Sequence, residues 1–216
     1  MSENVGELAL RPFEERDFYP LVSLIAQTWL ADFPGEPGEL AATVELCDYL
    51  SHTTWSLVAE RDGAPLGAVL LAEKDGVVAD ADEWRDRGSV AEREAARSPE
   101  ATLAMDLEMA GVVEGAGLAL DYEKAGAPEA AAALKLLIVS PEARGLGLGR
   151  RLLDRVRAHL RERGAAGYYL LTDDNCDVSF YDHMGLTQEL RRRSEVTWPG
   201  EEPGADFGIY VYSERL

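Results

Sequence analysis

The sequence is poor in the residues that build metal sites and disulfide frameworks. It holds two cysteines, Cys47 and Cys176, and three histidines among its 216 residues, with no Cys-x-x-Cys pair. Such a set favours neither a zinc site nor a disulfide-bonded secreted domain. We therefore predict that the protein holds no metal ion and that each cysteine is a small buried apolar residue.

Basic residues are scarce as well. The chain has 21 Lys and Arg against 40 Asp and Glu, which gives a formal net charge of −19. Nucleic-acid binding draws most of its affinity from Lys and Arg, so a nucleic-acid partner is excluded. A cationic or amine substrate is compatible with this acidity, and so is solubility alone.

Long apolar runs are missing too. No segment approaches the ~20 apolar residues that span a bilayer, and the start of the chain, MSENVGELALRPFEERD, lacks the basic and apolar regions of a signal peptide. We expect a cytoplasmic protein without a membrane partner. Because 46% of the residues are hydrophobic, the chain can build a substantial core, and we predict one domain over residues 1–216.

Apolar periodicity predicts an α/β fold. A strand over 8–13 is followed by a helix that Asp17 caps, by a second helix with Leu40, Val44 and Cys47 on one face, and by a hairpin over 55–73 that turns at Asp62-Gly63. The nearly continuous apolar run AALKLLIV is typical of a strand covered on both faces. The remaining expected elements are a helix after the glycines, a strand over 167–175, a short helix over 176–185, and strands over 195–200 and 207–216.

A segment of different composition, about 74–130, interrupts this pattern between the third and fourth strands. It is rich in Ala and Glu, and its 14 acidic residues against six basic ones give it a net charge of −8. Ser98-Pro99 divides it into two predicted helices. We expect Leu103, Leu107 and either Met105 or Met109 to dock these helices on the rest of the protein.

The stretch SPEARGLGLGRRLLDRV predicts a strand end, a glycine turn and the start of a helix. Glycines permit close approach of the backbone, and a helix N-terminus concentrates unpaired N–H donors, so the turn is suited to an anion. The Gly-Lys-Ser/Thr ending of a P-loop is absent, because Gly149 is followed by Arg150 and Arg151. A dinucleotide fingerprint fits poorly, since Arg150 stands where its third glycine belongs.

Arginines gather beside this turn. Residues 144–163 hold seven arginines against two acids, a local net charge of +5 in an otherwise acidic chain. These arginines either form a solvated helix face or meet the phosphates of a ligand.

The spacing of Arg144, Gly147 and Gly149 meets the pattern [Gln/Arg]-x-x-Gly-x-[Gly/Ala], and here the chain resembles the GNAT superfamily of acetyl-CoA-dependent N-acetyltransferases. Three segments carry the resemblance in order: LRPFEERDFYPLVSLI, LLIVSPEARGLGLGRRLL and LLTDDNCDVSFYDHMGL. It implies a mixed, mostly antiparallel central sheet flanked by helices, acetyl-CoA as cosubstrate, and transfer of its acetyl group to a primary amine of a small molecule or protein.

The resemblance also implies site residues. Tyr181 falls at the position of the general acid, and Asn175 at one that often binds pantetheine or else caps the short helix. The Val139 N–H is the expected donor to the thioester oxygen, from a strand that splays away from its neighbour. The residues expected to bind the pyrophosphate are Arg144, Gly145, Leu146, Gly147, Leu148, Gly149 and Arg150.

A general base is not evident from the sequence. Many relatives place a glutamate on the strand before the glycine turn, whereas this chain has Lys135 there. Five acids stay as candidates: Glu60, Glu73, Asp106, Glu108 and Asp173. The missing carboxylate leaves a second hypothesis open, a catalytically silent acyl-CoA-binding or regulatory module. The 74–130 helices either wall the amine pocket or serve as core or as the face of a homodimer.

Acetyl-CoA is expected to raise the melting temperature, because the turn can bind it only in the folded state. At 100 times its dissociation constant the gain is about 2.7 kcal/mol. Gly147→Asp should abolish the shift by adding bulk and negative charge to the turn. An unmoved melting temperature of the unsubstituted protein at saturating acetyl-CoA would contradict the assignment of this ligand.

Overall fold

The computed structural model describes residues 8–197, 199–200, 202 and 205–216. Its strands are β1 (Ala9–Arg11), β2 (Trp55–Arg61), β3 (Ala64–Glu73), β4 (Ala132–Val139), β5 (Gly167–Asp173), β6 (Thr187–Arg193) and β7 (Gly208–Arg215). Its α-helices are α1 (Phe18–Trp29), α2 (Glu36–His52), α3 (Ala81–Ala95), α4 (Pro99–Lys124), α5 (Leu148–Glu162) and α6 (Val178–His183). Residues 1–7, which entered the signal-peptide argument, lie outside the described part.

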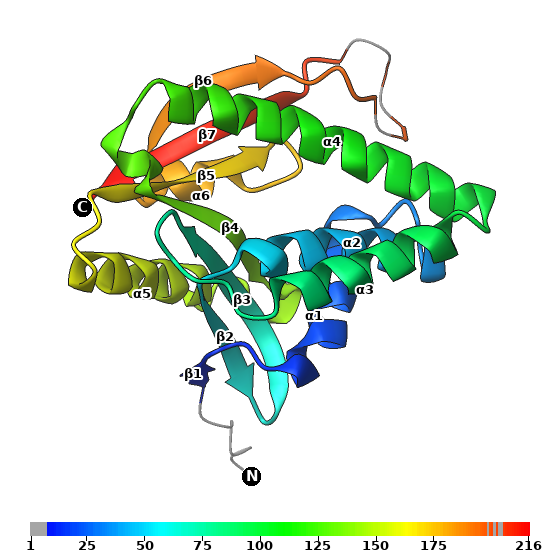
Figure 1. Ribbon diagram of the computed structural model, residues 1–216, viewed down its shortest axis with the longest axis horizontal. Coiled ribbons are helices and arrows are strands. Elements are labelled where there is room, and N and C mark those ends of the chain that lie inside the picture. The colour runs from blue at the N-terminus through cyan, green and yellow to red at the C-terminus, as the bar shows by residue number, and fades with distance from the viewer. Residues whose placement is uncertain (1–7, 198, 201, 203–204) are drawn as a thin grey trace.

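The strands form one sheet in the order β1-β2-β3-β4-β5-β7-β6, seen edge to edge in Figure 1. Every pair is antiparallel except β4 with β5. This confirms the expected α/β class, a mixed and mostly antiparallel sheet flanked by helices, with the helical insertion between the third and fourth strands.

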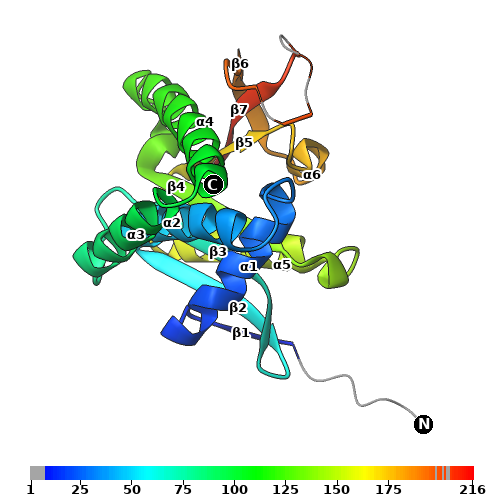
Figure 2. The ribbon, with the colours of Figure 1, turned by 90° about the vertical axis from the view of Figure 1, so that its right-hand side faces the viewer.

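Helices cover both faces of the sheet. Helices α1 to α4 lie on one face and α5 and α6 on the other, as Figure 2 shows. On α5 the predicted apolar stripe is confirmed, because all its members are buried under the sheet: Leu148, Leu152, Leu153, Val156 and Leu160. The sheet therefore separates the core residues under α1 to α4 from those under α5 and α6. A cleft that crosses the sheet can be lined by elements from both sides.

The hairpin and the split of the insertion follow the predicted local chemistry. Asp62 and Gly63 both have positive φ, 52° and 81°, which is the conformation that a two-residue hairpin turn requires. Ser98 caps α4 by accepting a hydrogen bond from the Ala101 N–H, and Pro99 occupies the first turn.

Asp17 does not cap α1, contrary to expectation. It is 1% exposed and receives both terminal nitrogens of Arg11, at 2.6 and 2.7 Å, together with the Glu14 N–H at 2.8 Å. Burial raises the pKa of the Asp17 carboxyl, but the hydrogen bonds from Arg11 and Glu14 outweigh it and leave the pKa below its usual value. The Asp17 carboxylate thus links β1 to the start of α1 through Arg11 and does not cap the helix.

The predicted strand over 195–200 is wrong where the structure describes it. Residues 195–197 and 199–200 contain no strand, and Trp198 lies outside the described residues. The neighbour of β7 is β6 instead, whose sequence TQELRRR is almost wholly exposed. An edge strand without a buried face has no apolar alternation from which it could be recognised.

The expectation for β4 is confirmed, because the strand has apolar cover on both faces. Leu136 and Ile138 belong to the core cluster that contains α1 and α2, and Ala132 and Leu134 belong to the cluster that contains α5. The residues between them are half-buried.

The insertion forms α3 and α4, and α4 runs across the molecule from α3 to the β6–β7 edge (Figure 1). Met105 is buried, and Leu107 and Met109 pack on the α1–α2 core, as expected. Leu103 is 51% exposed and does not dock. Farther along α4, Leu118, Ala119 and Tyr122 pack against β5 and β7.

None of the helices in the described part of the chain has the length and apolar character that crossing a membrane demands.

Replacing the buried carboxylate tests the attachment of β1. Asp17→Asn should lower the free energy of unfolding at neutral pH by about 3 kcal/mol, because it leaves the Arg11 charge poorly paired. The pKa of Asp17 is lower in the folded state, so its contribution is present above the unfolded pKa and is lost as the pH falls below it. Denaturant melts of both proteins should therefore converge in acid, and a constant difference at every pH would contradict this account.

Candidate active site

The site begins where β4 and β5 stop pairing. Their parallel ladder consists of Ala133 with Tyr169 and Leu134 with Leu170, and β4 continues to Val139 without β5 beside it. Because Ser140 N–H donates to Leu66 O on the other side, alternation turns the Val139 N–H toward the opening. The structure thus places an outward-facing donor at the predicted position.

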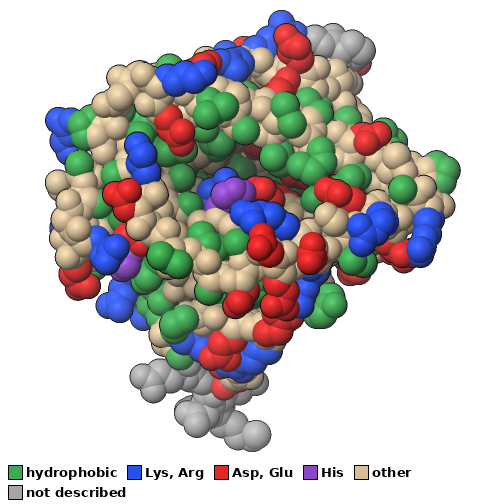
Figure 3. Space-filling model, viewed as in Figure 1, with side chains coloured by type: hydrophobic (Ala, Val, Ile, Leu, Met, Phe, Trp, Pro, Cys, Tyr) green, Lys and Arg blue, Asp and Glu red, His purple; other side chains and the backbone are tan. Residues whose placement is uncertain are grey.

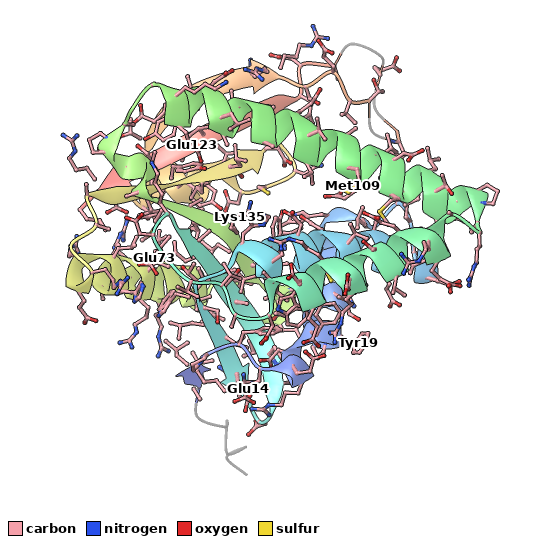
Figure 4. The ribbon with its side chains drawn as sticks, in the orientation of Figure 1. Glu14, Tyr19, Glu73, Met109, Glu123 and Lys135 are labelled. Carbon is pink, nitrogen blue, oxygen red and sulfur yellow. The ribbon has the colours of Figure 1, made fainter. Side chains whose placement is uncertain are left out.

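A bulge sits on the same strand. Leu70 pairs with Leu136 and Leu71 with Leu134, so Lys135 is the extra residue. Its side chain lies between α4 and α2 (Figure 4), with Nζ 5.7 Å from the centre of the Tyr49 ring. The Lys135 side chain therefore enters the cleft from β4, the strand on which many relatives of the resembled family place a glutamate.

The glycine turn follows β4 and opens α5. Gly145 and Gly147 have φ of 75° and 69°, a left-handed conformation that favours glycine. Gly147 is the N-cap of α5, and no side chain makes a capping bond to the first turn. The first N–H groups of a 15-residue helix therefore point out without protein acceptors, which suits an anion.

These elements border one cavity of about 1230 Å³. It appears in Figure 3 as the hollow between α4 and α2. The predicted site residues that line it are Val139, Arg144, Gly145, Gly147, Leu148, Gly149, Arg150, Asn175 and Tyr181. Leu146 is not among them and has a 60% exposed side chain, so its side chain is outside the cavity.

The arginines near the turn divide into two groups. Arg144 and Arg150 line the cavity and form no ion pair within the described residues. Arg157 instead binds Glu214 and Asp154, and Arg163 binds Glu73. Some of these arginines therefore hold the fold together through ion pairs, and the two that line the cavity belong to the glycine turn and the start of α5.

Tyr181 and its neighbours form the side of the cavity near α6. Burial raises the pKa of Tyr181, so its hydroxyl keeps its proton at neutral pH. Thr172 Oγ1 is buried and has no hydrogen-bond partner. The Asn175 N–H donates to Asp173 Oδ1 at 2.9 Å, so Asp173 and not Asn175 provides the side chain that stabilises this turn.

The two cysteines differ from each other. Cys47 is buried in the core, as predicted, whereas Cys176 is half-buried and lines the cavity. Burial raises the pKa of the Cys176 thiol to about 12, which keeps it protonated.

Three of the five candidate bases lie elsewhere. Glu60 pairs with Arg11 and Arg16, and Glu73 pairs with His159 and Arg163. Asp106 is exposed and does not line the cavity. Glu108 and Asp173 do line it, from α4 and β5.

The sequence analysis missed the contribution of α2. Glu45, Asp48, Tyr49 and His52 all line the cavity, and their spacing puts them on one helical face. Glu45 is 4% exposed, and its Oε1 accepts a hydrogen bond from the Tyr49 hydroxyl at 2.5 Å. The sequence did carry a signal for this contribution: these polar residues of α2 recur at helical spacing beside its apolar face.

Comparison with known families agrees with this geometry. The family described as "Acetyltransferase (GNAT) family" matches residues 76–186, just over half of the chain. The chain belongs to the GNAT family. A mycothiol acetyltransferase of Geodermatophilus obscurus is 38% identical over 73 residues, which are 33% of this chain and 23% of that relative. The match thus spans about a quarter of the relative's length.

Solved GNAT structures share the fold. A GNAT-family acetyltransferase of Staphylococcus aureus Mu50 superposes with a TM-score of 0.53 at 17% identity, covering 97% of this chain and 99% of the other. An agmatine N-acetyltransferase variant in its apo form gives 0.57 at 14% identity, with 97% and 99% covered. The ribosomal-protein-S18-alanine N-acetyltransferase of Escherichia coli gives 0.52 at 13% identity, with 97% and 94% covered. At these identities the likeness concerns the fold.

Proposed function

We propose that this GNAT protein transfers the acetyl group of acetyl-CoA to a primary amine of a small molecule or protein. The observation that carries the proposal is the shared cavity: it joins the uncapped start of α5, the free Val139 N–H, the protonated Tyr181 hydroxyl and a group of acids. When bound, acetyl-CoA supplies the activated acetyl thioester.

The residues of one half of the cavity fit this ligand. The N–H groups of residues 145–149 and the α5 dipole suit a pyrophosphate, and Arg144 and Arg150 add charge without a competing protein partner. Thr172 and Asn175 line the same cavity, and Thr172 Oγ1 has no hydrogen-bond partner among the described residues. An amide-rich pantetheine arm needs polar contacts of this kind.

Each proposed chemical role has a group. The Val139 N–H would donate a hydrogen bond to the thioester oxygen as negative charge develops on it. The new N–C bond forms as the C–S bond breaks. Tyr181 gives its proton to the departing sulfur, and the proton that the amine nitrogen loses replaces it. Because its pKa is raised, Tyr181 is present at neutral pH in the protonated form that a general acid requires.

The insertion would supply the wall for the amine. Glu108, Glu114 and Glu123 of α4 line the cavity, while buried residues of the same helix pack into two cores. One helix can therefore both line the proposed amine pocket and contribute residues to the hydrophobic core. We further propose that the chain acts as a single domain in the cytoplasm.

A catalytically silent acyl-CoA-binding module is the second candidate, and the same measurements separate the two. Thermal melts with acetyl-CoA report binding, and release of free thiol in the presence of an amine panel reports transfer. Binding with amine-dependent thiol release supports the enzyme. Binding without it, across alkyl, aryl and peptide amines, supports the silent module.

The hydroxyl of Tyr181 can be removed without loss of the ring. Tyr181→Phe should lower turnover by ~10²–10⁴-fold, since that is the usual contribution of a general acid. The melting-temperature shift by acetyl-CoA should be unchanged. Tyr19→Phe is the matched control, because Tyr19 is 72% exposed and lies outside the cavity. Wild-type turnover in Tyr181→Phe, with chemistry rate-limiting, would remove Tyr181 from this role.

A further inference from the structure

Three carboxyl groups from three elements line the cavity near one another. Glu45 comes from α2, Glu108 from α4 and Asp173 from the end of β5. They are close enough for the charge of one to raise the pKa of another: Glu108 acts on Glu45, and Asp173 acts on both. Like charges held together in a cleft are stabilised by a cation that enters it.

Glu45 gives independent evidence that this group of acids receives a ligand. The residue is 4% exposed and borders the cavity. Its Oε1 accepts from Tyr49, but its Oε2 has no hydrogen-bond partner among the described residues. A buried carboxyl oxygen without a partner is costly, so a donor that enters the cavity would satisfy it.

Other charged and titratable groups line the same cavity from the elements around Glu108. They are Asp48, Tyr49 and His52 on α2, Lys135 on β4, Glu114 and Glu123 on α4, Tyr169 on β5, Cys176, Asp177 and Tyr181 at and before α6, and Arg144 and Arg150 at the glycine turn. Lys135 lies over the Tyr49 ring and makes no ion pair among the described residues. Glu114 is occupied by the Ser194 hydroxyl and the Glu195 N–H.

We propose that Glu45, Glu108 and Asp173 form the acceptor subsite, that they bind a basic alkylamine as its ammonium ion, and that Glu108 takes the proton which the nitrogen loses before attack. This rests on the proposed function and names its substrate class and its base. One proton moves from the ammonium nitrogen to the Glu108 carboxylate, and the nitrogen lone pair then forms the bond to the acetyl carbon. As the C–S bond breaks, the sulfur takes the proton of the Tyr181 hydroxyl, and the second proton of the nitrogen restores that hydroxyl. The base that β4 lacks thus comes from the inserted helix.

The three acids are not equivalent. Asp173 Oδ1 holds the Asn175 N–H, and Glu45 is fixed by Tyr49, whereas Glu108 has no hydrogen bond or ion pair within the described residues. Burial, followed by the charge of Asp173, raises the pKa of Glu108 to about 7, and burial raises that of Glu45 well above its usual value. Glu108 is therefore suited to exchange a proton near neutral pH, while Glu45, held by Tyr49, offers its Oε2 as a hydrogen-bond acceptor to the amine.

Glu108→Gln and Asp106→Asn form a matched pair, because both replace an acid of α4 by its amide and only Glu108 lines the cavity. With saturating acetyl-CoA and n-butylamine, kcat/KM from thiol release should fall by ~10²-fold or more in Glu108→Gln. The acid limb of its pH profile should disappear, whereas Asp106→Asn keeps the wild-type profile. Aniline, which is uncharged at neutral pH, should be a poor acceptor for all three proteins.

A binding measurement makes the outcome independent of turnover. n-Butylamine, without acetyl-CoA, should raise the melting temperature of the wild type and of Asp106→Asn but not of Glu108→Gln. If acetyl-CoA gives no thermal shift while n-butylamine does, the proposed function fails and the cation subsite stands. An unchanged acid limb in an active Glu108→Gln, or no n-butylamine shift in the wild type, overturns the subsite.

The pH dependence of thermal stability gives a third measurement on the same proteins. The folded-state pKa of Glu108 is raised, so its contribution to stability is present below the unfolded pKa and is lost as the pH rises through about 7. Glu108→Gln should consequently melt higher than the wild type at ~pH 8 but not at ~pH 5. Equal differences at both pH values would show that Glu108 does not titrate there and would overturn its role as base.

Discussion

The architecture of the cleft depends on one interrupted interaction, the hydrogen-bonded ladder between β4 and β5. The two strands are parallel neighbours for two residue pairs and then separate. The sheet thereby loses hydrogen bonds that an unbroken ladder would make, and it gains an opening in its centre with backbone donors on its edge. The glycine turn, α5 and α6 are all placed around this opening, since they leave the carboxyl ends of the same two strands.

Much of the half that would bind acetyl-CoA was predictable, because its signals are local. A glycine with positive φ, a helix that starts without a cap and an apolar stripe at helical spacing all leave marks in consecutive residues, and Gly147 and the α5 stripe were found in that way. Tyr181 and Val139 were located by resemblance, and the structure brings both to the cavity, although their roles stay predictions.

The opposite half was predictable only in part, for a physical reason. Glu108 and Asp173 were among five candidate acids, but they and Glu45 are distant in the sequence and become neighbours only when α2, α4 and β5 pack together. Asp106 and Glu108 looked alike in the sequence, and only the rotation of α4 in the fold separates an exposed acid from a cavity acid. The strand β6 was missed because its exposed residues carry no apolar pattern, and Asp17 was misassigned because its partner Arg11 belongs to another element.

The division of labour within the cavity has an evolutionary consequence. The end proposed to bind phosphates would rely largely on main-chain N–H groups, which most substitutions leave in place. The proposed acceptor site would rely on side chains, several of them from a single inserted helix whose reverse side anchors it to the protein. Under this proposal, changes along one stripe of α4 would alter the acceptor and leave the donor site intact, so relatives that share the scaffold could diverge at this helix.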